Sequence, residues 1–222
     1  QSIGNRERPK ERAAGSPHEE DRQHRQQENQ RGIDDGASRF DPVTKKFTEF
    51  KSPTFENADG IGNTYGLAAD GDGNAWWAEM NLDMLAKSDL ETGKVFEVKV
   101  PPVPGQKELA TSEEREMYVA AGSTWNAAPL WAEGPRRLGA DKKGSVIWVC
   151  NWWGGSLAKI DTHTLKVTLV PLPNPDTQQP YQAAVDKDHN VWINLMNADE
   201  VIKFDPKNSK WTEYPFPTHG AE

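Results

Sequence analysis

Large polar and aromatic residues recur at two kinds of position in this sequence where small turn residues would suffice. One kind opens short apolar stretches and holds Tyr65, Arg136, Arg137 and Tyr181. The other kind follows Trp-containing stretches, and its members are Glu79, Asn81, Asn151, Trp152, Trp153, Asn194 and Asn197. Arg forks pair with carboxylates, and Trp and Tyr offer ring faces and polar tips. These residue types favour a ligand-binding site, with packing between repeats as the alternative for the Trp pair.

Catalytic and metal-binding patterns are sparse. Glu79 is a weak catalytic candidate, and the five His residues (18, 24, 163, 189 and 219) avoid the positions that open apolar stretches. Multi-His metal sites and Ser-His-Asp catalysis are therefore poorly supported. The turns at 70–74 and 186–190 resemble the start of a calcium loop, but Asn occupies the twelfth position of each instead of an acidic ligand. We interpret them as hairpin turns and predict no metal site, with calcium as the alternative.

A repeat positions these side chains. Trp76, Trp148 and Trp192 each stand 13 positions before an Asp, a Pro follows that Asp after 12 positions, and Asp161 and Asp205 are 44 positions apart. Each complete copy contains four short β-rich stretches separated by turn residues, the pattern of four-stranded propeller blades. The sequence therefore predicts an all-β fold, a β-propeller with about 3.5–4 blades present. Residues 39–53 match only the second half of the unit, so we expect further blades outside this chain.

Propeller topology brings the two kinds of position together. The first strand of each blade lines the channel, and its start lies on the same face as the hairpin between the second and third strands. We therefore expect one ligand-binding site on the channel face, formed by Tyr65, Glu79, Arg136, Arg137, Asn151, Trp152, Tyr181 and Asn194.

One connection is unusually long. The predicted blades cover residues 62–104, 134–175 and 179–218, which leaves 105–133 as an insertion leading into a first strand. Topology puts that insertion on the channel face, and long loops in compact domains are functional or disordered. Trp125 and Trp131 favour a packed lid, with a solvated insertion as the alternative.

Composition separates the N-terminal segment from the rest. Residues 1–38 are polar and poor in large apolar side chains, so we expect them to be disordered. Eight Lys/Arg and eight Asp/Glu cancel within residues 1–39, so the net charge of −8 belongs to the remainder, which argues against nucleic acid as a partner. No apolar run approaches the ~18 residues of a membrane span. Cys150 is the only cysteine, so an intrachain disulfide is excluded.

Residues 180–218 carry the pattern Pro-Tyr-x-x-Ala-Val-Asp-x-x-x-Asn-Val-Trp, then Asn-Ala-Asp-x-Val-x-x-Phe-Asp-Pro, then Thr-Glu-Tyr-Pro-x-Pro-Thr. The pattern recurs in residues 39–53, 63–101 and 134–173 and resembles the streptogramin B lyase (virginiamycin B lyase) family. The resemblance implies a seven-bladed propeller, bacterial and exported, either periplasmic or secreted. It also implies an enzyme that linearises a cyclic depsipeptide antibiotic by carbon–oxygen elimination, with a catalytic His, a supporting Glu and magnesium.

The matching positions depart from the family. Its catalytic His starts an inner strand, where this chain has Tyr65, Arg136 and Tyr181. Its Glu after the blade Trp is matched by Glu79, whereas the other copies have Asn151 and Leu195. The lyase site is therefore not expected in these blades.

Three hypotheses follow for the function. The first is a propeller that binds a small molecule or peptide on its channel face and has no lyase activity in this chain. The alternative is an active carbon–oxygen lyase, with magnesium, whose acid/base residues lie in other blades. A weaker alternative is a metal-dependent, lactonase-like hydrolase, which would need several carboxylates facing the channel.

Overall fold

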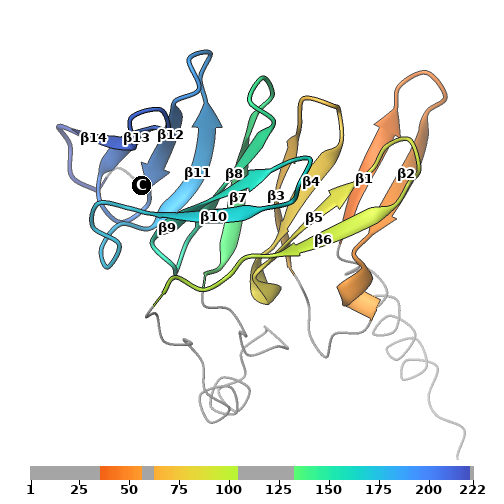
Figure 1. The fold of residues 1–222 in the computed structure, drawn as a ribbon, viewed down its shortest axis with the longest axis horizontal. Helices are drawn as coiled ribbons and strands as arrows, with labels where there is room; N and C mark the ends of the chain where they lie inside the picture. The colour runs from red at the N-terminus through yellow and green to blue at the C-terminus, as the bar shows by residue number, and fades with distance from the viewer. Residues whose placement is uncertain (1–35, 57–62, 105–132, 221–222) are drawn as a thin grey trace, which may run out of the picture. The chain divides into compact units, whose positions relative to one another are not determined.

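The computed structural model describes residues 36–56, 63–104 and 133–220, which are almost entirely β-structure (Figure 1). They form one two-stranded and three four-stranded antiparallel sheets. The two-stranded sheet consists of β1 (Gly36–Asp41) and β2 (Lys46–Lys51), followed by the 3-10 helix η1 (Pro53–Glu56).

Each four-stranded sheet is a meander in chain order. The first contains β3 (Thr64–Ala69), β4 (Ala75–Glu79), β5 (Met84–Ser88) and β6 (Val95–Lys99), with the 3-10 helix η2 (Met80–Leu82) between β4 and β5. The second contains β7 (Pro135–Asp141), β8 (Val146–Asn151), β9 (Ser156–Asp161) and β10 (Val167–Pro171). The third contains β11 (Pro180–Val185), β12 (Val191–Leu195), β13 (Glu200–Asp205) and β14 (Lys210–Pro215).

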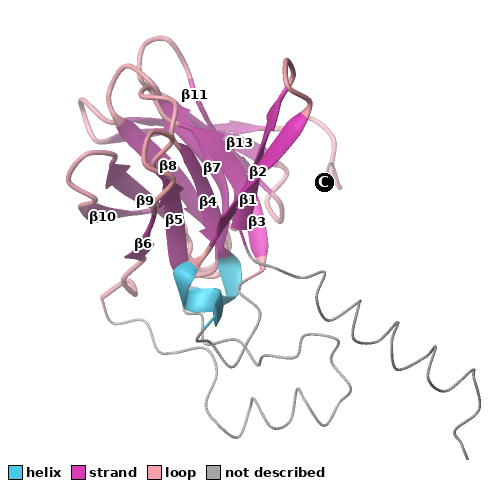
Figure 2. Ribbon diagram, turned by 90° about the vertical axis from the view of Figure 1, so that its right-hand side faces the viewer, coloured by secondary structure: helices cyan, strands magenta, loops and turns pink. Residues whose placement is uncertain are grey.

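The four-stranded sheets are propeller blades with their first strands innermost. Strand β7 lies beside both β3 and β11. Figure 1 shows the hairpins β3–β4, β7–β8 and β11–β12 at one end of the strands, and Figure 2 shows η1 and η2 together at the other end. The predicted fold class is therefore confirmed as an all-β, partial β-propeller.

Small residues let the inner strands approach closely. A Cβ at Gly66 on β3 would lie 2.4 Å from the carbonyl oxygen of Arg136 and 2.6 Å from the Cα of Arg137. A Cβ at Gly139 on β7 would lie 2.6 Å from the carbonyl oxygen of Ala183. Glycine suits both positions because any side chain would push neighbouring backbones apart.

Apolar side chains fill the spaces between successive sheets. Trp77 packs with Phe50 between the β1–β2 sheet and the first blade. Trp76 lies in a cluster that includes Ile147 and Ile160 of the second blade. Adjacent Trp residues on one strand thus bury opposite faces of the first blade, as strand alternation requires.

The three repeat Trp residues occupy equivalent positions. Each is paired with a small residue on the first strand and with a Lys on the third, whose Nζ lies over the ring at 5.5, 5.8 and 5.5 Å for Trp76, Trp148 and Trp192. Trp76 and Trp148 are buried. Trp192 is half-buried, because no further sheet among the described residues covers that face of the third blade.

The end of the N-terminal segment differs from the sequence prediction, and most of the predicted lid lies outside the described residues. Strand β1 begins at Gly36, so residues 36–38 belong to a strand and not to the N-terminal segment. Those three residues continue the pairing with β2 as far as Lys51. The rest of that segment and residues 105–132 of the predicted lid, including Trp125 and Trp131, lie outside the described residues. Within the described ranges, no helix has the length and apolar character to cross a membrane.

Candidate ligand-binding site

The predicted site residues lie at or near one end of the blades. The first residue of each inner strand pairs with the last residue of the second strand: Thr64 with Glu79, Pro135 with Asn151, and Pro180 with Leu195. The starts of the inner strands and the hairpins after the second strands therefore share one end, as expected from the topology.

A β-bulge follows each of these pairs. In every blade the inner strand carries one extra residue there, between Thr64 and Leu67, between Pro135 and Leu138, and between Pro180 and Gln182. A bulge interrupts strict alternation and re-aims side chains. It explains why Arg136 and Arg137, neighbours on one strand, both reach the same two Tyr rings.

Arg136 is the centre of an aromatic cluster. The carbon atom of its guanidinium lies 3.7 Å from the ring centroid of Trp152, 5.1 Å from that of Tyr65, 5.5 Å from that of Trp153 and 5.6 Å from that of Tyr181. Cation–π attraction and stacking stabilise a guanidinium in such surroundings. The Nε of Arg136 is nevertheless buried and has no hydrogen-bond partner among the described residues.

Two Tyr residues join the first and third blades across the second. The hydroxyl oxygens of Tyr65 and Tyr181 are 2.8 Å apart, and their rings meet edge to face. Tyr181 also meets Trp152 edge to face, with centroids 5.6 Å apart. The hydrogen bond with Tyr65 raises the pKa of the Tyr181 phenol. Residues from three successive blades therefore converge, and the structure brings together five of the eight predicted ligand-binding residues: Tyr65, Arg136, Arg137, Trp152 and Tyr181.

This cluster contains two adjacent cations, one of them half-buried. Burial lowers the pKa of Arg136, and Arg137 lowers it further, whereas Tyr65 and Tyr181 act in the opposite direction. Arg137 lies over the ring of Tyr181 at 4.5 Å and donates to Oε1 of Gln182 at a long 3.4 Å. Within the described residues, neither guanidinium pairs with a carboxylate.

Backbone hydrogen bonds hold Arg136 against Trp152. The amides of Trp152, Trp153 and Gly154 donate to carbonyls of Gly134 and Glu133, which joins the hairpin after β8 to the start of β7. Gly134 has a φ of +62°, and a Cβ there would lie 1.9 Å from the Trp153 ring. A glycine is required at this position by both its conformation and its space.

A buried polar chain supports the same region. Asp83 accepts from the amides of Glu133 and Gly134, and Oε1 of Glu133 accepts from the amide of Val103. Oε2 of Glu133 accepts from Ser156, whose hydroxyl in turn accepts from Nδ2 of Asn151. Burial raises the pKa of Glu133. The residues predicted from the sequence do not include Asp83 or Ser156, and Glu133 falls in the predicted insertion. The Asn-x-Asp that contains Asp83 recurs at 197–199, a signal that could have identified it, whereas no repeat marks Ser156.

The remaining predicted ligand-binding residues lie elsewhere or act indirectly. Glu79 is fully buried, and its Oε1 accepts from Nε1 of Trp77, on the side of β4 that faces the β1–β2 sheet. Asn151 is fully buried in the polar chain. Oδ1 of Asn194 accepts from the amide of Gln182, the residue that contacts Arg137.

The positions that match the supporting Glu of the lyase family carry one carboxylate, that of Glu79. Magnesium prefers six oxygen ligands in octahedral geometry. At these positions Oε1 of Glu79 accepts from Trp77, Nδ2 of Asn151 donates to Ser156, and Leu195 has no ligand atom. Among the described residues, no group of three or more His, Cys, Asp or Glu could hold a metal ion.

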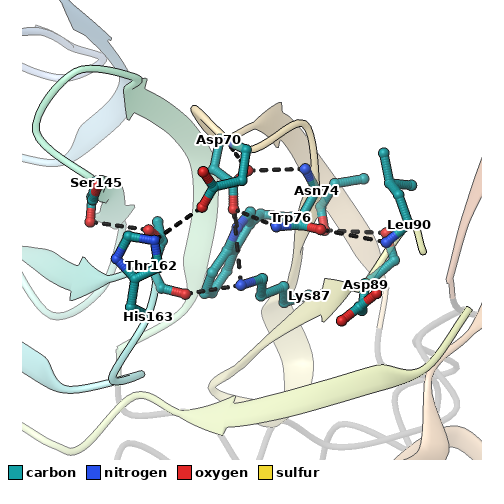
Figure 3. A network of polar contacts seen from close by, with 12 residues as sticks. Asp70, Asn74, Trp76, Lys87, Asp89, Leu90, Ser145, Thr162 and His163 are labelled. Atoms are coloured by element: carbon teal, nitrogen blue, oxygen red, sulfur yellow. Dashed lines mark hydrogen bonds and ion pairs between the residues drawn. The ribbon is translucent and has the colours of Figure 1, made fainter. Parts of the chain in front are cut away.

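The opposite end of the blades has a structural role. Figure 3 shows Asp70 accepting from Nε1 of Trp76 beside Lys87, whose Nζ donates to the carbonyl of Thr162 in the next blade. Asp70 also accepts from the amides of Asp72 and Asn74, as a hairpin turn requires. The carboxylate of Asp70, the first residue of this calcium-like turn, is thus used inside the protein.

The comparisons with known proteins concern the fold. No protein-family model matches the sequence, and no curated protein matches it significantly. Virginiamycin B lyase from Staphylococcus aureus matches the structure at 17% identity and a TM-score of 0.60, covering 84% of this chain and 50% of the lyase chain. A catalytically inactive variant of that lyase, with quinupristin, matches equally well.

A second kind of propeller protein matches almost as well. Dihydro-heme d1 dehydrogenase NirN, in complex with DHE, matches at 14% identity and a TM-score of 0.55, covering 83% of this chain and 34% of that chain. This chain thus spans 50% of the length of the lyase chain and 34% of the length of the dehydrogenase chain. At such identities the likeness shows the fold alone: this chain has the architecture of a partial β-propeller, distantly related to that of virginiamycin B lyase.

Proposed function

We propose that this protein binds a small molecule or peptide on the channel face of its propeller and that these blades do not perform the lyase reaction. The observation that carries the proposal is the convergence of Tyr65, Arg136, Arg137, Trp152 and Tyr181 from three successive blades. Ligand sites combine ring faces with a few convergent polar groups, and this cluster has both. A bulge and backbone hydrogen bonds hold the segments that carry Arg136 and Trp152, so little ordering of the backbone is left for a ligand to impose.

The residue types at the starts of the inner strands are the reason that we propose no lyase chemistry for these blades. The starts of the three inner strands carry Tyr and Arg, neither of which serves as a neutral-pH acid/base in the way His does. Glu79, the one residue matching the family's Glu, is buried against Trp77. Similarity to the lyase structures supports a propeller and gives no support for their reaction.

A screen of small molecules and short peptides, neutral, cationic and anionic, tests binding. Ligand-observed NMR detects binders, and the variant Tyr181→Ala locates them. Binders should lose affinity in this variant and keep it in Trp192→Ala, which removes an aromatic residue from the outer face of the third blade. Finding no binder, or binders indifferent to Tyr181→Ala, would refute the proposal.

Incubation with quinupristin tests the second part of the proposal, that these blades do not perform the lyase reaction. Mass spectrometry should detect no linearised product above a protein-free control. Turnover that scales with protein concentration would show that these blades contain the acid/base machinery after all.

A further inference from the structure

Arg136 and Arg137 form a cationic pair that the described protein does not neutralise. They are consecutive, and the bulge between Pro135 and Leu138 directs both towards Tyr65 and Tyr181. Two adjacent positive charges repel each other, and partial burial strengthens the repulsion because the local dielectric is lower than in water. Among the described residues no carboxylate offsets this, so the pair is at its least stable without an anion.

The hydrogen-bonding capacity of the pair is also largely unused. Within the described ranges the buried Nε of Arg136 has no hydrogen-bond partner, and the guanidinium is surrounded by ring faces, which accept no conventional hydrogen bond. Arg137 makes one long bond to the neutral amide of Gln182. A guanidinium has five N–H donors in a planar fork that fits the two oxygens of a carboxylate.

The aromatic neighbours suit the same ligand. They fix the orientation of both guanidiniums, so less side-chain entropy is lost when an anion binds. The Tyr65 and Tyr181 rings are only partly buried and leave apolar surface beside the cations. A ligand with a carboxylate on a flat or apolar body would satisfy the charge and cover those rings.

We infer that Arg136 and Arg137 are the anion-binding groups of the channel-face site and that its ligand carries a carboxylate. This inference rests on the proposed function and narrows it. Arg137, with its weak neutral partner, exchanges Gln182 for the ligand. Arg136, stacked on Trp152, is the fixed second donor.

Benzoate and benzamide are matched probes, because they share shape and ring and differ in charge. Protein-observed NMR titrations at low chloride measure the affinities of benzoate and benzamide for the wild type and for the variants Arg137→Gln and Lys203→Gln. The last variant removes one positive charge beside Trp192, away from the starts of the inner strands. A further variant, Arg136→Lys, keeps the positive charge but removes the fork of the guanidinium. Thermal unfolding of each variant confirms that it folds.

Benzoate should bind wild type and Lys203→Gln alike, and benzamide should bind at least about tenfold more weakly, since hydrogen bonds to charged groups are the strong ones. Arg137→Gln should weaken benzoate binding by about tenfold or more, and Arg136→Lys should weaken it less. Equal binding of benzoate and benzamide would overturn the inference while leaving the proposed function intact. Failure of both probes, or benzoate binding unchanged by Arg137→Gln, would overturn it too, and the proposed function would then depend on its own screen.

Discussion

At the residue scale, the site depends on the close backbone approach that Gly66 allows. The position of Gly66 lets β3 approach the carbonyl of Arg136 closely, which brings Tyr65 within reach of Tyr181. Gly66→Ala should force the two strands apart, lower the free energy of unfolding by about 1–3 kcal/mol as overpacking does, and weaken benzoate binding. Chemical denaturation and NMR titration measure both effects. If stability and binding both stay at the wild-type level, the close approach of β3 and β7 is wrong.

Glu133 gives a pH dependence whose sign is fixed by burial. Because burial raises its pKa above the ordinary 4.5, the folded state holds the proton more tightly than the unfolded state. The contribution of this carboxyl to stability is therefore greatest below pH 4.5 and is lost as pH rises through the raised pKa.

The variant Glu133→Gln removes that titration. The free energy of unfolding of wild type minus that of the variant should decrease from acidic to neutral pH, as urea denaturation at a series of pH values would show. A difference that stays constant or grows with pH would contradict the burial of this carboxylate.

At the element scale, the second strands carry the packing between blades. Trp148 lies between the second and third blades and meets Phe204 edge to face at 5.7 Å, whereas Trp192 occupies the equivalent position on an uncovered face of the described sheets. Trp148→Ala should lower the free energy of unfolding by about 3–5 kcal/mol. Trp192→Ala should lower it clearly less, because fewer contacts are lost. Denaturant unfolding compares the two directly. Equal costs would mean that the two residues are not distinguished by the covering blade.

The sequence predicted these elements well because blade packing repeats. Trp76, Trp148 and Trp192 recur at constant spacing since each has the same task, and the turns after Asp70 and Asp186 recur for the same reason. The bulges could not be predicted, because one extra residue in an inner strand leaves the Trp-to-Asp spacing unchanged.

Part of the site was within reach of the sequence and part was not. Tyr65, Arg136, Arg137 and Tyr181 were identified because topology alone places them at the starts of inner strands. The side on which Glu79 is buried depends on its alternation with Trp77, and Asn151 reaches the distant Glu133 only through Ser156. Neither follows from a repeat pattern.

At the scale of the whole molecule, three blades suffice to assemble the cluster. Tyr65, Arg136 and Tyr181 come from the first, second and third four-stranded sheets, so no single blade contains the site. The contacts between sheets that hold the blades together at the opposite end, such as Lys87 to Thr162, therefore also keep the site assembled. We infer that this assembly presents two Arg side chains to an anionic ligand.

A crystal structure of the protein grown with benzoate tests that claim most directly. The account predicts a carboxylate held between the guanidiniums of Arg136 and Arg137, with the ring against Tyr65 or Tyr181 and with Arg136 still stacked on Trp152. Benzoate bound elsewhere, or both guanidiniums paired with carboxylates of the protein itself, would contradict it.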